Sequence, residues 1–121
     1  MHIKDKVVVV TGGASGIGKS LSERFAREGA RAVIVSDINQ VGVDATVADI
    51  AALTEARGIV ANVGKEDEVS ALVDATLAEF GHIDLFCSNA GIFTAGGENV
   101  STEAWQSIWD INVMSHVFAA R

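Results

Sequence analysis

The stretch Val7-Val8-Val9-Val10-Thr11-Gly12-Gly13-Ala14-Ser15-Gly16-Ile17-Gly18 decides the fold of this chain. Its four valines are a short β-branched run, which is typical of a strand buried on both faces of a parallel sheet. A helix is expected to begin where the glycines end, because Ile17, Leu21 and Phe25 recur at steps of four residues with charged residues between them. Gly29 is expected to end this helix.

The glycine loop between strand and helix predicts an anion-binding site. A strand, a glycine loop and a helix in this order bring unpaired backbone N–H groups and the positive end of the helix to the place where a pyrophosphate can bind. The glycines allow a tight turn and a close approach of the backbone to the ligand. A tight turn that binds nothing is the alternative interpretation. The residues that follow the first helix help to distinguish the two.

A second strand, residues 31–36, ends in Asp37. This carboxylate lies about twenty residues beyond the glycine loop, where an acidic residue accepts hydrogen bonds from the adenosine ribose of a dinucleotide. It would repel a 2′-phosphate, and Ser15, Ile38 and Asn39 supply no cation to bind one. We therefore expect a preference for NAD over NADP. The alternative is a solvated carboxylate at the end of a strand.

Strands and helices continue to alternate along the rest of the chain. The expected elements are a helix over 43–56, a strand over 59–61, a helix with an apolar stripe from Val69 to Phe80 that Gly81 ends, and a strand over 83–87. This alternation predicts an α/β fold in one domain, residues 1–121, with a doubly wound parallel sheet of strand order 3-2-1-4. The glycine loop and the Asn89-Ala90-Gly91 turn should then lie side by side at the carboxyl ends of the strands.

Composition narrows the classes of function. The chain is 49% hydrophobic with a net charge of −7, which is typical of a soluble globular domain and argues against nucleic acid as a partner. No apolar stretch is long enough to span a bilayer and no signal peptide is recognisable, so we expect a cytoplasmic protein without membrane contact. The single cysteine, Cys87, excludes an internal disulfide, and no His or carboxylate pair has the spacing of a metal site.

With these motifs in place, the chain resembles the short-chain dehydrogenase/reductase family over residues 5–121. The resemblance rests on Thr11, Gly12, Gly16 and Gly18 of a Thr-Gly-x-x-x-Gly-x-Gly loop, on Asp37, on Asn89-Ala90-Gly91, and on Trp105 followed by Asn112-Val113. It implies a Rossmann-type domain that binds NAD. It also implies an oxidoreductase that transfers hydride to or from a small-molecule carbonyl or alcohol, and a homo-oligomer in the complete protein.

The resemblance also assigns site residues. The expected cofactor-binding set is Thr11, Gly12, Ser15, Gly16, Ile17, Gly18, Asp37, Asn62, Val63, Asn89, Ala90 and Gly91. Asn112 matches the asparagine of the family's Asn-Ser-Tyr-Lys catalytic set, which holds a water that links the lysine to a proton relay. Asn62-Val63 stands where the family usually has Asp-Val against the adenine amino group. We expect the amide oxygen to accept the same hydrogen bond with lower affinity.

The chain contains no tyrosine, and it stops within the helix that carries Asn112. The family uses a tyrosine as general acid/base, with a lysine four residues later and a serine, and general acid/base chemistry contributes roughly 10²–10⁴-fold to rate. We therefore expect these residues to be the N-terminal, cofactor-binding part of a NAD-dependent oxidoreductase and to be inactive alone. In the alternative, the 121-residue chain is a non-catalytic NAD-binding or interaction module. A reading frame that continues past Arg121 into Tyr-x-x-x-Lys would distinguish the two.

Three further expectations concern single side chains and the edge of the sheet. His116 is one helical turn from Asn112, where a packing histidine and a functional one are both open interpretations. Lys19 is expected to be solvated, with a phosphate contact as the alternative. A sheet that ends at residues 85–87 exposes an apolar edge, and Trp105 and Trp109 lose part of their cover, so we expect marginal stability or self-association of these residues alone.

Overall fold

The computed structural model describes residues 1–121 and centres on a four-stranded parallel sheet in the order β3-β2-β1-β4. The strands are β1 (Val7–Thr11), β2 (Ala32–Asp37), β3 (Glu55–Val60) and β4 (Leu85–Cys87). The helices are α1 (Gly16–Arg27), α2 (Gln40–Ile50), α3 (Glu66–Phe80), α4 (Thr102–Trp109) and α5 (Ser115–Ala120). The doubly wound α/β fold and its strand order, expected from the sequence, are confirmed.

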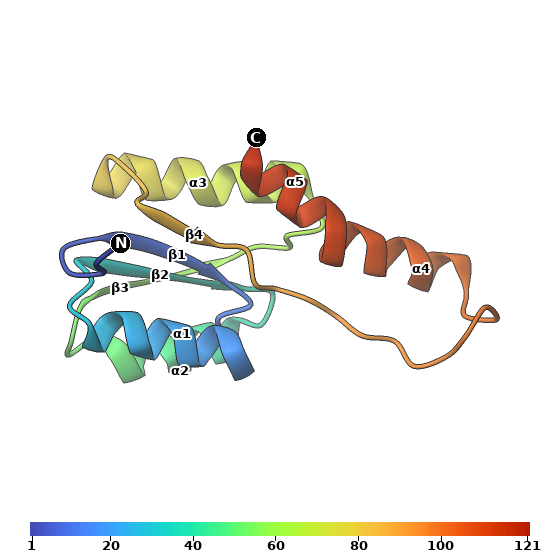
Figure 1. Ribbon diagram of the computed structural model, residues 1–121, viewed down its shortest axis with the longest axis horizontal. Coiled ribbons are helices and arrows are strands. Elements are labelled where there is room, and N and C mark those ends of the chain that lie inside the picture. Colours follow the sequence, from blue (N-terminus) through green and yellow to red (C-terminus); the bar gives the residue numbers. More distant parts are fainter.

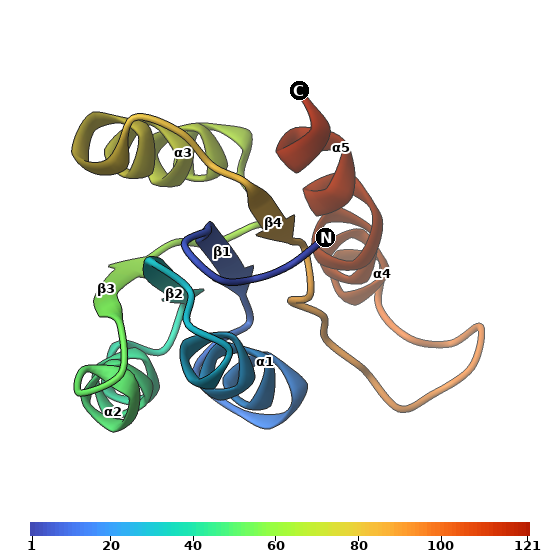
Figure 2. The ribbon, with the colours of Figure 1, turned by 60° about the vertical axis from the view of Figure 1, so that its left-hand side comes forward.

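Helices cover both faces of the sheet, so the core forms two layers. In Figures 1 and 2, α1 and α2 lie on one face and α3 lies on the other, with α5 beside it. Val8 and Val10 of β1 pack in the layer of α1 and α2, whereas Val7 and Val9 pack with Leu72 of α3. All four valines are fully buried. The unbroken apolar run of β1 is thus explained by burial on both sides.

Helices α1 and α3 each end next to a glycine. α3 ends at Gly81, which adopts a left-handed φ of 82° and donates its N–H to the Leu77 carbonyl at 2.8 Å. α1 ends at Arg27, and Gly29 has a left-handed φ of 81° with its N–H on the Ala26 carbonyl at 3.1 Å. Both glycines therefore close their helices in the way the sequence predicts.

The expected boundary between the second helix and the third strand is wrong. α2 ends at Ile50 rather than at residue 56, and β3 begins at Glu55 and covers six residues rather than 59–61. Pairing with β2 explains the difference, because Ala32 lies opposite Glu55 and the register continues to the end of both strands. Gly58, which falls between the expected helix and strand, lies within β3, where a Cβ would be 2.6 Å from Val43 of α2. β3 was hard to recognise because its residues are mostly exposed at the sheet edge.

The last strand and helix also differ from expectation. β4 is limited to Leu85–Cys87 instead of 83–87. The Asp84 N–H still donates to the Val7 carbonyl at 3.0 Å, but the Val7 N–H bonds to the Asp84 carboxylate at 2.8 Å rather than to a backbone carbonyl. The single helix expected around Asn112 consists of α4 and α5 joined by a π-helical turn, Asp110–Met114. Such turns are frequent at functional sites.

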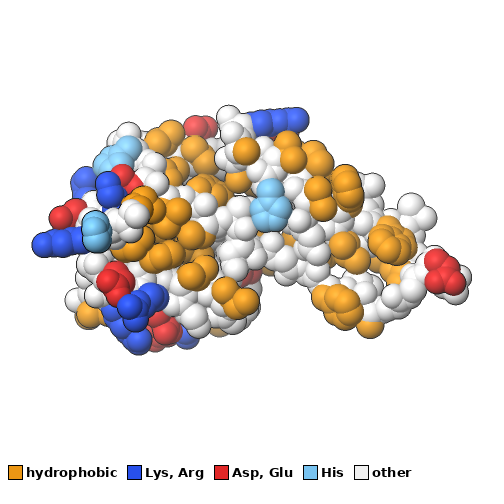
Figure 3. All heavy atoms as spheres, viewed as in Figure 1, with side chains coloured by type: hydrophobic (Ala, Val, Ile, Leu, Met, Phe, Trp, Pro, Cys, Tyr) orange, Lys and Arg blue, Asp and Glu red, His pale blue; other side chains and the backbone are white.

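Residues 88–101 form a long connection that projects away from the sheet before α4 begins (Figure 1). Hydrophobic side chains gather on the surface of this part, over the connection and α4 (Figure 3). Phe93 is 89% exposed, and Trp105 and Trp109 are 54% and 55% exposed. None of the helices combines the length and the apolar character that crossing a bilayer requires.

Candidate functional site

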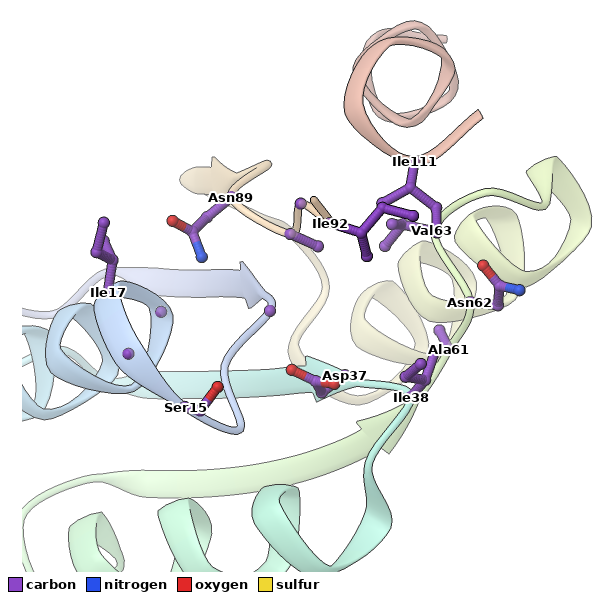
Figure 4. A pocket seen from close by; sticks show the side chains of 15 residues that line it. Ser15, Ile17, Asp37, Ile38, Ala61, Asn62, Val63, Asn89, Ile92 and Ile111 are labelled. Atoms are coloured by element: carbon purple, nitrogen blue, oxygen red, sulfur yellow. The ribbon is translucent and has the colours of Figure 1, made fainter. Parts of the chain in front are cut away.

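A cavity of about 410 Å³ lies at the carboxyl ends of the strands, where the sheet topology predicts a ligand site. It is lined by Gly12, Ser15, Gly16, Ile17, Gly18, Asp37, Ile38, Ala61, Asn62, Val63, Asn89, Ala90, Gly91, Ile92 and Ile111 (Figure 4). The glycine loop and the Asn89-Ala90-Gly91 turn therefore lie side by side, as expected. Every predicted cofactor residue lines this cavity except Thr11, and Asn112 also lies outside it.

The glycine loop presents backbone donors at the cavity. Ser15 precedes α1 in an extended conformation, and no side chain caps the first turn of this helix. The N–H groups of Gly16, Ile17 and Gly18 consequently have no acceptor within the chain. Together with the positive end of α1, these donors form a site for an anionic group such as a phosphate.

Close packing keeps the loop in this shape. A Cβ on Gly18 would lie 2.0 Å from the Gly12 carbonyl oxygen, so only glycine fits there. Gly12 has a left-handed φ of 67°, and a Cβ on it would lie 2.9 Å from the Cα of Ala90. The Thr46 hydroxyl of α2 donates to the Gly13 carbonyl at 3.0 Å and is fully buried. Thr46 was not predicted, because a threonine within a helix carries no sign of a partner 33 residues away.

Asp37 joins the glycine loop to the start of α2. One carboxylate oxygen accepts the Ala14 N–H at 3.2 Å, and the other accepts the Asn39 N–H at 3.2 Å. Each oxygen keeps a further lone pair, and the residue lines the cavity. Asp37 therefore has a structural role beyond that of a solvated carboxylate, and it can also accept hydrogen bonds from ligand hydroxyl groups.

Thr11 and Asn89 hold the ends of β1 and β4 together. The Thr11 hydroxyl donates to the Cys87 carbonyl at 3.3 Å and accepts the N–H groups of Asn89 and Ala90 at 3.0 and 3.2 Å. The Asn89 amide donates to the Thr11 carbonyl at 3.0 Å. Since Thr11 is 2% exposed, it positions the Asn89-Ala90-Gly91 turn and does not face the cavity.

Apolar side chains form the walls at the other end of the cavity. Ile38 and Ala61 follow β2 and β3, and Ile111 reaches down from the helical segment above Val63 and Ile92 (Figure 4). The sequence analysis did not assign Ile38, Ala61, Ile92 or Ile111 to the site. Their sequence positions could have indicated them, because each is adjacent in the sequence to a predicted site residue. The arrangement fits a flat aromatic ring between aliphatic side chains.

Asn62, at this end of the cavity, belongs to a rigid turn. Its N–H donates to Glu68 Oε2 at 2.6 Å, its carbonyl accepts the Lys65 N–H at 3.1 Å, and its Oδ1 accepts the Gly64 N–H at 2.9 Å. The Asn62 N–H and the neighbouring Lys65 ammonium hold the pKa of the Glu68 carboxyl below its usual value. Glu68 therefore stays ionised and fixes the turn, a role that the sequence analysis missed.

Asn112 interacts with backbone rather than with the cavity. Its Oδ1 accepts the Ile92 N–H at 2.9 Å, and its Nδ2 donates to the Ile92 carbonyl at 2.8 Å. The side chain thus ties the π-helical turn to the residue that follows Asn89-Ala90-Gly91.

The remaining candidate side chains have local partners. Lys19 pairs with the Asp49 carboxylate at 2.7 Å, so its ammonium group has a partner within the chain. His116 Nδ1 lies 2.7 Å from the hydroxyl of Ser88, the residue that follows β4. Cys87 is half-buried, and burial raises the pKa of its thiol, which disfavours the reactive thiolate. Groups of three or more potential metal-ligating side chains are absent.

A family model described as short chain dehydrogenase matches residues 6–121. An uncharacterized oxidoreductase of Bacillus subtilis, YvrD, is 36% identical over the whole chain. The 1-deoxy-11-beta-hydroxypentalenate dehydrogenase of Streptomyces exfoliatus is 34% identical over the whole chain. This chain covers 46% and 45% of those two proteins, so it spans about half the length of the curated relatives that it matches.

Solved structures agree with the sequence relatives. A short-chain dehydrogenase/reductase from Burkholderia phymatum in complex with NAD superposes with a TM-score of 0.95 at 31% identity, over 100% of this chain and 43% of that one. A 3-ketoacyl-(acyl-carrier-protein) reductase from Brucella melitensis complexed with NADH gives a TM-score of 0.89 at 32% identity, over 98% of this chain and 49% of that one. Both neighbours were solved with a nicotinamide dinucleotide.

Proposed function

The chain belongs to the short-chain dehydrogenase/reductase family, and on this premise we propose that residues 1–121 form the NAD-binding part of an oxidoreductase. The complete protein would transfer hydride to or from a small carbonyl compound or secondary alcohol. The observation that carries the proposal is the joint placement, around one cavity, of the free N–H groups of Gly16–Gly18 and the Asp37 carboxylate.

The lining residues fit the parts of NAD. The N–H groups at the start of α1 would bind the pyrophosphate, and Asp37 would accept hydrogen bonds from the adenosine ribose hydroxyls. Ile38, Ala61 and Val63 would enclose the adenine. The Asn89-Ala90-Gly91 turn at the end of β4 would border the nicotinamide side. When bound, the nicotinamide ring supplies the hydride acceptor or donor.

We infer a preference for NAD over NADP from Asp37, because its carboxylate would repel a 2′-phosphate. Isothermal titration calorimetry with both dinucleotides tests the proposal directly. The Asp37→Ala variant should lose affinity for NAD relative to NADP. The matched control is Asp44→Ala, an exposed carboxylate of α2 outside the cavity, which should leave the ratio unchanged.

Two results would count against these assignments. An unchanged ratio in Asp37→Ala would remove Asp37 from the ribose site and leave the NAD-binding role in place. If neither NAD nor NADP binds to the folded protein, the proposed function itself is rejected.

Catalysis is proposed for the complete protein only. Residues 1–121 contain no tyrosine to act as acid/base, so we expect no measurable turnover from them. Asn112 would serve by positioning the π-helical turn against Ile92. A coding sequence that continues past Arg121 into Tyr-x-x-x-Lys would support a catalytic protein, and we propose that this complete enzyme is cytoplasmic and homo-oligomeric. A coding sequence that ends at Arg121 would favour the alternative, a non-catalytic NAD-binding or interaction module.

A further inference from the structure

Thr46 of α2 directs its hydroxyl toward the glycine loop instead of toward its own helix. It is fully buried, and its Oγ1 donates to the Gly13 carbonyl at 3.0 Å. A buried threonine inside a helix commonly bonds the carbonyl four residues earlier, as Thr76 of α3 does at 2.8 Å. Gly42, one turn before Thr46, also faces the loop, because a Cβ on it would lie 2.6 Å from the Ala14 Cβ. This face of α2 is therefore packed directly on the glycine loop.

The peptide group between Gly13 and Ala14 is held at both ends. Its carbonyl accepts the Thr46 hydroxyl, and its N–H, which belongs to Ala14, donates to Asp37 Oδ2 at 3.2 Å. The carbonyl and the N–H of a trans peptide point in opposite directions in one plane, so a bond at each end fixes the orientation of that plane. Gly13 is buried, and no backbone N–H donates to its carbonyl. Thr46 therefore supplies the partner that this buried carbonyl needs.

The Asp37 carboxylate depends on this peptide group for one of its two hydrogen bonds within the chain. Oδ2 accepts the Ala14 N–H, and Oδ1 accepts the Asn39 N–H at 3.2 Å. Without the bond to Ala14, the bond to Asn39 alone would leave the carboxylate free to rotate. Asp37 lines the cavity at the end of β2 (Figure 4), where its remaining lone pairs can accept hydrogen bonds from a ligand.

We propose that Thr46 is a positioning residue for recognition of the adenosine ribose. Its hydroxyl fixes the Gly13–Ala14 peptide group, and the Ala14 N–H then holds the Asp37 carboxylate in the orientation that accepts the ribose 2′-hydroxyl. This inference rests on the proposed NAD-binding function and adds a residue that acts without touching the ligand. Thr46 is fully buried and does not line the cavity.

The Thr46→Val variant removes the hydroxyl and keeps nearly the same shape. The buried Gly13 carbonyl then lacks a partner, which costs free energy, so the peptide group should turn and withdraw the Ala14 N–H from Asp37. Thr46→Ser retains the hydroxyl and should retain this geometry. The matched control is Thr76→Val, which removes an equally buried hydroxyl that bonds within its own helix and lies outside the cavity.

The experiment is a calorimetric titration of the natural full-length protein with NAD and with its 2′-deoxyadenosine analogue. The unmodified protein should bind NAD about tenfold more tightly than the analogue, because the analogue lacks one hydroxyl group for the Asp37 carboxylate. In Thr46→Val the preference should fall to about threefold or less. Thr46→Ser and Thr76→Val should keep the preference of the unmodified protein. The ratio of dissociation constants cancels any loss of folded protein and any change in pyrophosphate binding, since both affect the two ligands equally.

A double-mutant cycle tests whether Thr46 acts through Asp37. Asp37→Ala should itself remove most of the preference for NAD over the analogue. Adding Thr46→Val to Asp37→Ala should then change the ratio no further. A further decrease in the double variant would show that Thr46 acts on the ribose by another route and would overturn the inference.

The remaining results separate this inference from the function on which it rests. An unchanged ratio in a folded Thr46→Val, or a lost preference in Thr46→Ser, overturns the role of Thr46 and leaves NAD binding in place. If the unmodified protein binds NAD with a preference below about threefold, the inference is also overturned. If neither dinucleotide binds, both proposals fail. Where Thr46→Val does not fold, hydrogen exchange of the Ala14 amide in the unmodified protein decides: protection supports the inference, and exchange as fast as in an unfolded chain overturns it.

Discussion

Gly16 and Gly18 belong to the same loop, but the absence of a side chain serves a different purpose at each. A Cβ on Gly18 would lie 2.0 Å from the carbonyl oxygen of Gly12, which is backbone and cannot move aside. Gly16 has a left-handed φ of 53°, and a Cβ there would meet no protein atom within 4 Å. Gly18 is therefore required because a side chain would not fit in the packed loop. Gly16 is favoured by its left-handed backbone conformation, and a side chain there would point into the open space of the cavity.

This difference predicts distinct effects of adding one methyl group. Gly18→Ala should lower the free energy of unfolding by about 3 kcal/mol, because the loop must move to relieve the overlap. Gly16→Ala should lower it by only about 1 kcal/mol through its left-handed conformation. Gly16→Ala should also weaken NAD binding by roughly tenfold, since its methyl group takes space beside the phosphate donors. Urea unfolding and calorimetry measure the two quantities, and equal destabilisation by both substitutions would contradict the assignment.

At the residue scale, motif spacing predicted most of the cavity, because glycines and a strand-end carboxylate have few alternative uses. It did not predict Ile38, Ala61 or Ile111, because an apolar residue next to a motif looks like any core residue until the fold is known. Thr11 and Asn112 show the opposite case. Their residue types indicated the right region, but their side chains bind backbone groups of neighbouring segments rather than facing the cavity.

At the element scale, helices with a clear apolar stripe and a closing glycine were predicted well. α2 and β3 were not, since α2 has a weak apolar stripe and β3 alternates little, with charged Glu55 and Arg57 at the sheet edge. The six residues of β3 are set by their pairing with β2, a long-range constraint that is absent from local sequence. The sequence around Asn112 contained no local pattern that predicts the π-helical turn either.

The π-helical turn leads to a prediction about the connection before α4. Asn112→Ala removes both hydrogen bonds to Ile92, which should lower the free energy of unfolding by about 1–2 kcal/mol. It should also speed hydrogen exchange at the Ile92 amide. Asn112→Asp keeps the acceptor and should protect that amide nearly as well. The control is Gln106→Ala, which removes the exposed bond from Gln106 to Asp110 on the same helical segment. Slow exchange at Ile92 in Asn112→Ala would show that the connection is held by other contacts.

At the scale of the whole molecule, Asp84 connects the amino ends of β1 and β4. Its carboxylate accepts the Val7 N–H at 2.8 Å and pairs with Lys6 at 3.1 Å and with His82 at 3.1 Å. The Val7 N–H contributes most to holding the pKa of the Asp84 carboxyl below its usual value, and Lys6 lowers it further. A carboxyl with a lowered pKa in the folded state stabilises the fold while it is ionised.

This linkage predicts the direction of the pH dependence. The stabilisation by Asp84 should be fully present above the unfolded-state pKa, near pH 4, and should be lost as the pH falls through the lower folded-state pKa. Asp84→Asn cannot ionise, so its stability difference from the unmodified protein should shrink below about pH 4. Thermal unfolding at a series of pH values measures this difference. Asp74→Asn, an exposed carboxylate without an ion pair, should show no such change. A constant difference down to acid pH would assign the role of Asp84 to hydrogen bonding alone.

The two outer strands of the sheet differ in polarity, and this difference affects how the chain would associate with other copies of itself. At β3, Arg57 pairs with Glu79 and lies over the Phe80 ring, so charge protects that edge. β4 offers the half-buried apolar residues Leu85–Cys87 and has a neighbour on one side only. The exposed hydrophobic side chains over the connection and α4 lie beyond β4 (Figures 2 and 3). The β4 side of the molecule therefore combines an open strand with large exposed aromatic side chains.

Residues 1–121 expressed alone should consequently self-associate or melt without a sharp transition. Trp105 and Trp109 are both more than half exposed, one helical turn apart on α4, and large exposed apolar patches favour association. Size-exclusion chromatography with light scattering, over a range of concentrations, should show species larger than the 12.6 kDa monomer. The double variant Trp105→Glu and Trp109→Glu should shift the distribution toward monomer. Leu53→Glu, at an equally exposed leucine between α2 and β3, should leave it unchanged. A monomer that melts cooperatively at all concentrations would show that the fold tolerates this open side.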